Sequence, residues 1–182
     1  MLFFYILLQL FSCKISTKRD LPKLTVKTPD GKEIKLKDGE HNAIQKQIIE
    51  EFLPRFGHRA ILLYCGDSDN KYGLVHEVKE LAKIGFADLK QSILPDIVAY
   101  SQEKNWIFLI EAYHTSNPIT PQRKMELEQE LGENANRVVF VTAFEKSSLA
   151  IAKAFPAGTE FSIAILISSR ALLLMLKLIS PP

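Results

Sequence analysis

Two acidic residues, Asp96 and Glu111, stand out because of the apolar stretches that carry them. The first stretch, residues 94–100, reads LPDIVAY, and the second, residues 106–113, reads WIFLIEAY. If these stretches form a hairpin that turns at Glu103-Lys104, Asp96 lies directly opposite Glu111. Opposed residues share one face of a sheet, with Cβ atoms about 4.5–5.5 Å apart. The pattern therefore predicts a close pair of carboxylates.

Two carboxylates at that separation repel each other, and a divalent cation between them removes the conflict. Mg²⁺ accepts one or two carboxylates and keeps several waters. It can activate one of those waters and stabilise the charge that develops in phosphodiester hydrolysis. The alternative is that Asp96 begins a strand, Glu111 ends one, and both are solvated at the sheet rim. A one-residue slip in register would place them on opposite faces.

The elements that must hold this pair follow from hydrophobic periodicity and from turn residues. Strands are expected at 60–65, 95–100, 106–112, 137–143 and 161–167, and helices at 42–53, 72–84, 121–131 and 147–155. A hairpin is expected around Pro29-Asp30-Gly31. This order predicts an α/β domain with a mixed central β-sheet and helices on both faces.

The helix boundaries are also readable from the residue types at their ends. Asn42 is the expected N-cap of the first helix, and Pro54 is expected to end it. The helix at 121–131 has Thr120 as its cap, Pro121 at its first position and Gly132 after its last turn.

Composition sets broad limits on the class of protein. The chain has 182 residues, is 47% hydrophobic and 24% charged, and carries a net charge of +2. These values are typical of a globular domain, and they neither support nor exclude nucleic acid as a partner. Two cysteines, Cys13 and Cys65, form neither a disulfide framework nor a zinc pattern. Cytoplasmic localisation is expected.

The two ends differ in character from the middle. Residues 1–38 are interpreted as an atypical N-terminal segment with a connector hairpin, 39–168 as the main domain, and 169–182 as an atypical apolar tail. The apolar run 1–11 is shorter than the roughly 20 residues that span a bilayer. The run 163–179 is interrupted by Arg170, which is costly within a membrane. No membrane association is expected. The alternative hypothesis is that the apolar run 1–11 marks a secreted or membrane-attached protein.

Several separate blocks carry a family resemblance. They are Gly39 to Gly57 (GEHNAIQKQIIEEFLPRFG), Leu63 to Lys71 (LYCGDSDNK), Leu94-Pro95-Asp96, Lys104 to Ala112 (KNWIFLIEA) and Val139 to Phe144 (VFVTAF). In this order they resemble the catalytic domain of the BsuBI/PstI type II restriction endonucleases, within the PD-(D/E)XK nuclease superfamily. The likeness covers roughly residues 39–160 and implies a restriction-endonuclease-like fold.

The resemblance also implies a chemistry. Asp96 would supply the Asp of the PD motif and Glu111 the acidic residue of (D/E)XK, with both binding Mg²⁺. The expected function is site-specific cleavage of double-stranded DNA by a homodimer, in a restriction-modification system. A second hypothesis is a truncated remnant that folds but does not cut, because 40 residues before the catalytic block cannot supply the family's N-terminal recognition domain.

One position departs from the motif. The third residue of (D/E)XK should be lysine, and here it is Tyr113, which cannot supply a positive charge at neutral pH. Lys71, after the first core strand, and Lys124, at the start of the 121–131 helix, are the preferred substitutes. His114 and Arg123 are further candidates close to the motif or to that helix.

Overall fold

The computed structural model describes residues 22–67, 70–76, 78–86, 94–113, 120–145, 163–168 and 171–175. A two-stranded hairpin, β1 (Lys23–Lys27) and β2 (Glu33–Lys37), precedes a seven-stranded sheet of order β4-β3-β5-β6-β7-β8-β9. Within the described ranges, no helix is long and apolar enough to cross a membrane.

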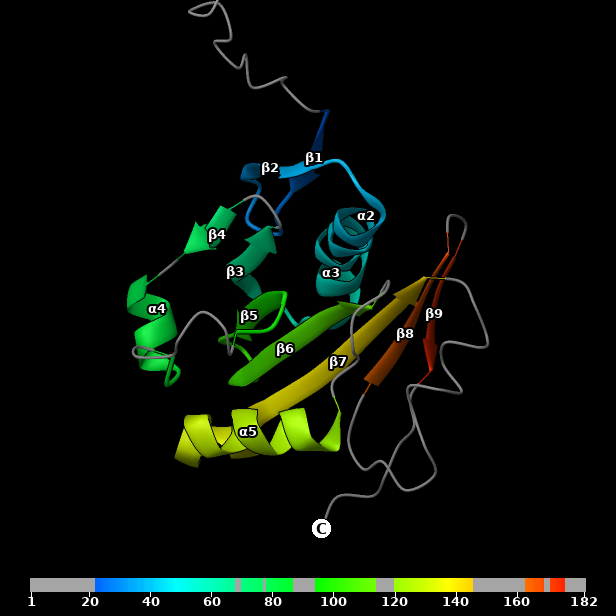
Figure 1. The fold of residues 1–182 in the computed structure, drawn as a ribbon. Coiled ribbons are helices and arrows are strands. Elements are labelled where there is room, and N and C mark those ends of the chain that lie inside the picture. The colour runs from blue at the N-terminus through cyan, green and yellow to red at the C-terminus, as the bar shows by residue number, and fades with distance from the viewer. Residues whose placement is uncertain are drawn as a thin grey trace, which may run out of the picture.

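The large sheet is mixed, as the sequence predicted. Its strands are β3 (Ile61–Asp67), β4 (Asn70–His76), β5 (Ile97–Ser101), β6 (Trp106–Tyr113), β7 (Val138–Glu145), β8 (Ile163–Ser168) and β9 (Ala171–Met175). The pairs β6–β7 and β7–β8 are parallel, and the other neighbouring pairs are antiparallel. Helices cover both faces, with α2 and α3 on one side and α5 on the other (Figure 1).

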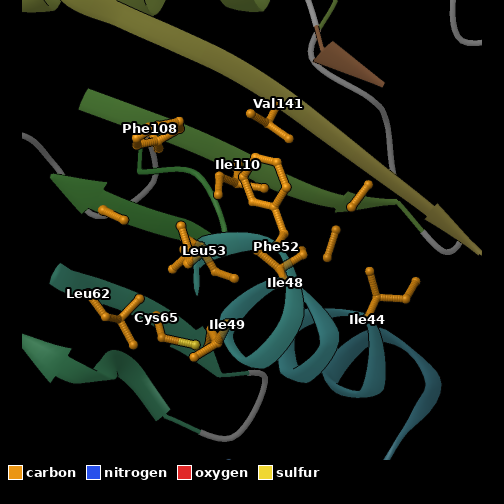
Figure 2. Close-up of a cluster of buried hydrophobic side chains, with 14 of the residues drawn as sticks. Ile44, Ile48, Ile49, Phe52, Leu53, Leu62, Cys65, Phe108, Ile110 and Val141 are labelled. Carbon is orange, nitrogen blue, oxygen red and sulfur yellow. The ribbon is translucent and has the colours of Figure 1, made fainter. Parts of the chain in front are cut away.

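The first helical region packs an apolar stripe onto the sheet. It comprises α2 (Glu40–Gln47), a π-helical turn (Ile48–Phe52) and α3 (Leu53–Phe56). Figure 2 shows the stripe facing side chains on the strands, with Phe52 against Phe108 at a ring distance of 6.3 Å. The hairpin adds Val26 and Leu36, both fully buried, to the same core. This core fixes the angle at which α2 approaches the sheet.

Both boundary predictions for this first helix were wrong. Asn42 is not the N-cap, because the helix begins at Glu40 and the Asn42 amide donates to the Lys37 carbonyl at 2.8 Å. Pro54 does not end the helix, which continues to Phe56. The π-helical turn directly before Pro54 changes the local hydrogen-bond pattern, so a residue without an N–H is accommodated there.

The opposite face is covered by α4 (Val78–Lys83) and α5 (Pro121–Leu131). Leu127 and Leu131 of α5 pack with Leu109 and Phe140 of the sheet. The predicted caps of α5 are confirmed. The Thr120 hydroxyl accepts a hydrogen bond from the Arg123 N–H at 3.1 Å, and Gly132 ends the helix with a φ of 54°.

Two segments differ from the expected secondary structure. The helix predicted at 72–84 is a strand, β4, up to His76, followed by the short helix α4. Short apolar runs fit either period, and pairing with β3 decides this one. Residues 171–175, interpreted from the sequence as part of an atypical apolar tail, form β9 against β8. The helix predicted at 147–155 lies outside the described residues.

Because Phe52 anchors α2 and α3 to the sheet and is 1% exposed, its truncation should destabilise the domain. We expect Phe52→Ala to lower the free energy of unfolding by about 3–5 kcal/mol, measured by urea denaturation. Met125→Ala is the control, because Met125 is 59% exposed and should change stability by less than about 0.5 kcal/mol. Similar losses in both variants would contradict the packing described here.

Candidate active site

The predicted hairpin register is confirmed. Strands β5 and β6 pair from Ser101 opposite Trp106 to Ile97 opposite Ile110, so the next opposed residues are Asp96 and Glu111. Their side chains lie near each other at the end of the hairpin, close enough for the charge of Asp96 to raise the pKa of Glu111. Both side chains are half-buried, which does not favour the alternative in which both carboxylates are fully solvated at the sheet rim.

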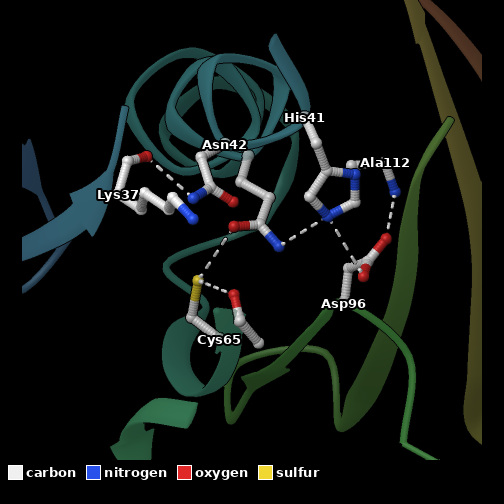
Figure 3. Close-up of polar contacts among 8 residues, drawn as sticks. Lys37, His41, Asn42, Cys65, Asp96 and Ala112 are labelled. Atoms are coloured by element: carbon white, nitrogen blue, oxygen red, sulfur yellow. Dashed lines mark hydrogen bonds and ion pairs between the residues drawn. The ribbon is translucent and has the colours of Figure 1, made fainter. Parts of the chain in front are cut away.

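Asp96 is held as an anion by two further groups (Figure 3). The backbone N–H of Ala112 donates to Asp96 Oδ2 at 2.8 Å, and His41 Nε2 lies 3.4 Å from Asp96 Oδ1. Burial alone would raise the pKa of Asp96, but the contact with His41 and the Ala112 N–H outweigh burial and lower it. Asp96 is therefore the ionised member of the pair.

The environment of Glu111 raises its pKa, whereas the pKa of Asp96 is lowered. Burial and the adjacent negative charge of Asp96 raise the pKa of Glu111 to about 8, and the Arg123 guanidinium opposes that rise. At neutral pH the pair of carboxyl groups therefore retains one proton, which Glu111 holds. A divalent cation would replace that proton.

The sequence did not identify His41 and Gln45 as residues of the site. Both lie on α2, which covers the face of the sheet opposite to α5. Hydrogen bonding to Asp96 raises the pKa of His41 despite its partial burial. Gln45 Nε2 lies 3.3 Å from His41 Nε2, and its Oε1 accepts from the Cys65 thiol at 3.7 Å. The sequence contained one signal for Gln45, because this polar residue directly follows Ile44 of the apolar stripe. The structure shows that Gln45 is fully buried.

Tyr64 on β3 also belongs to the site and was likewise missed. It is 6% exposed, and burial together with the negative charges near it, including those of Asp96 and Glu111, raises the pKa of its phenol. The site thus receives side chains from β3, β6, α2 and the residue before β5.

The basic residues that could replace the lysine of the (D/E)XK motif lie in different environments. Arg123, in the first turn of α5, acts electrostatically on Glu111. Lys124 pairs with Glu128 at 3.6 Å and lies 5.8 Å from the centre of the Phe140 ring. Lys71 lies on β4, two strands from β5 and so about 10 Å away by strand spacing, and its side chain is not described. His114 lies outside the described residues.

The donor set fits a hard divalent cation. Among the residues that the structure describes, no group of three or more His, Cys, Asp or Glu side chains is placed to hold a metal. Two adjoining carboxylates nevertheless suit Mg²⁺, which needs few protein ligands because water and phosphate oxygens complete its shell. Asp96 and Glu111 are the residues that would hold it.

A mixed sheet with a carboxylate pair at the end of its central hairpin defines an α/β domain built around an acidic site. The chain belongs to the BsuBI/PstI restriction endonuclease domain family, whose family model matches residues 24–156. It is 35% identical over 136 residues to the type II restriction enzyme BsuBI of Bacillus subtilis, a match that covers 75% of this chain and 43% of that enzyme.

A solved structure agrees with the family assignment. The SdaI restriction endonuclease matches with a TM-score of 0.65 and 25% identity, over 79% of this chain and 45% of that one. The chain therefore spans less than half the length of either relative. The restriction-endonuclease-like fold expected from the sequence is confirmed.

The raised pKa of Glu111 makes stability depend on pH. Because the folded state binds the Glu111 proton more tightly than the unfolded chain, the stability it contributes is present below the ordinary pKa of 4.5 and lost as the pH rises to about 8. Glu111→Gln keeps a neutral group there. We expect this variant to gain roughly 2–3 kcal/mol over wild type between about pH 5 and about pH 8.5 in urea denaturation.

The control for this experiment is Glu133→Gln, which removes an exposed carboxylate from the turn after α5. Its stability curve should run parallel to that of the wild type across the same pH range. If the Glu111→Gln curve is also parallel to that of the wild type, Glu111 does not retain a proton in the folded state.

Proposed function

We propose that this chain is the catalytic domain of a type II restriction endonuclease that hydrolyses phosphodiesters of double-stranded DNA with Mg²⁺. The observation that carries the proposal is the facing pair of Asp96 and Glu111 at the end of the β5–β6 hairpin, in a chain of the BsuBI/PstI family. A homodimer acting in the cytoplasm, within a restriction-modification system, completes the proposal. Two-fold symmetry would match a palindromic DNA site.

Asp96, Glu111 and a basic residue have different roles in the proposed reaction. Asp96, which His41 and the Ala112 N–H stabilise as an anion, would be the first ligand of the cation. Glu111 would be the second ligand in its deprotonated form, which the raised pKa of its carboxyl group opposes in the absence of a cation. Mg²⁺ at this position would activate a water and stabilise charge on the scissile phosphate. Arg123 is the cation with a defined electrostatic effect on Glu111, whereas Lys71 and Lys124 remain the alternatives predicted from sequence.

The direct test is DNA cleavage by the purified chain. With Mg²⁺ we expect discrete fragments from supercoiled plasmid, none with EDTA, and a loss of about 100-fold or more in Asp96→Asn, which preserves shape but weakens metal binding. Asp38→Asn is the matched control, because Asp38 is an exposed aspartate on the same domain. Absence of cleavage by folded wild-type protein would instead favour the remnant that folds but does not cut.

The cation can be assigned by comparing Arg123→Gln, Lys124→Gln and Lys71→Gln in the same cleavage assay. The Arg123 charge lowers the pKa of Glu111, so its removal should reduce cleavage and move the acidic limb of the pH profile to higher pH. Lys124→Gln should leave the position of that limb unchanged. A shift of the limb in either lysine variant, but not in Arg123→Gln, would assign the role to that lysine.

A further inference from the structure

The hydroxyl of Thr142, in the middle of β7, has an unusual environment. Thr142 is fully buried, and its Oγ1 has no hydrogen-bond partner among the residues that the structure describes. Burying a hydroxyl without a partner costs free energy, whereas valine would fill the same volume without that cost. The hydroxyl therefore stabilises the protein only when a further polar group hydrogen-bonds to it.

The sheet register places this hydroxyl beside the carboxylate pair. Thr142 pairs with Glu111 across the parallel β6–β7 ladder, so both side chains project from the same face. On that face, Phe140 and Phe144 flank Thr142 along β7, and both are buried. The residue paired with Thr142 on β8 is Ala164, a residue type without a polar side chain. Of the two residues paired with Thr142 in the described part of the sheet, Glu111 is the one with a polar side chain.

We propose that Thr142 is a positioning residue of the metal site, whose hydroxyl accepts a hydrogen bond from a water bound to the divalent cation. The inference rests on the proposed function, since Asp96 and Glu111 must hold that cation. A cation such as Mg²⁺ keeps several waters, and each of them donates hydrogen bonds to nearby oxygen atoms. Outer-shell partners of this kind typically change metal affinity by about 10–100-fold.

The test compares Thr142→Val, which keeps the shape and loses the hydroxyl, with Thr142→Ser, which keeps the hydroxyl. Mn²⁺ binding is measured by titration calorimetry without DNA, and the unfolding temperature is measured without metal. We expect Thr142→Val to bind Mn²⁺ about 10-fold more weakly and to unfold at a higher temperature without metal. Thr142→Ser should bind Mn²⁺ within about 3-fold of wild type.

The carboxylate variants Asp96→Asn and Glu111→Gln separate this inference from the function on which it rests. If both lose Mn²⁺ binding while Thr142→Val binds as tightly as wild type, only the role of Thr142 is overturned. Equal weakening in the valine and serine variants, or a lower unfolding temperature for Thr142→Val, overturns it as well. If the wild type binds no Mn²⁺, or binding survives in both carboxylate variants, the proposed metal site is also overturned.

Discussion

The repulsion between Asp96 and Glu111 is the constraint to which the surrounding structure responds. Two carboxylates on opposed residues of a partly buried hairpin cannot both be charged without compensation. Asp96 contacts His41 and accepts a hydrogen bond from the Ala112 N–H. Glu111 retains a proton, and the charge of Arg123 lowers the pKa of its carboxyl group. Apart from the Ala112 N–H of β6, the compensating groups come from α2 and α5, on opposite faces of the sheet, so the site depends on both layers of helix packing.

The central hairpin was the most predictable part of the molecule. Its register follows from a short turn between two strongly apolar strands, and a slip by one residue would have moved every side chain of one strand to the opposite face of the sheet. The same reasoning placed α5, because Thr120, Pro121 and Gly132 are residue types with strong positional preferences at helix ends. Asp96 and Glu111 follow from this hairpin alone, and so could be identified without the rest of the fold.

The contributions of α2 and of β7 could not be predicted in the same way. The contact between His41 and Asp96 joins residues far apart in sequence, and it depends on how α2 is tilted by its apolar stripe. No local pattern encodes that tilt. Arg123 was one of several basic candidates, and only the packing of α5 over β6 and β7 distinguishes its effect on Glu111. Short-range periodicity also could not separate a strand from a helix at β4.

The π-helical turn between α2 and α3 has a consequence for how this helix can vary. Successive residues of an α-helix are rotated by about 100°, and a π turn locally changes that phase. Before the π turn, α2 directs His41 and Gln45 towards polar atoms. Further along, Phe52 and Leu53 point into the apolar core. Loss of one residue here would force a choice between those two alignments. The number of residues between His41 and Phe52 is therefore constrained by the two sets of contacts that this helical region makes.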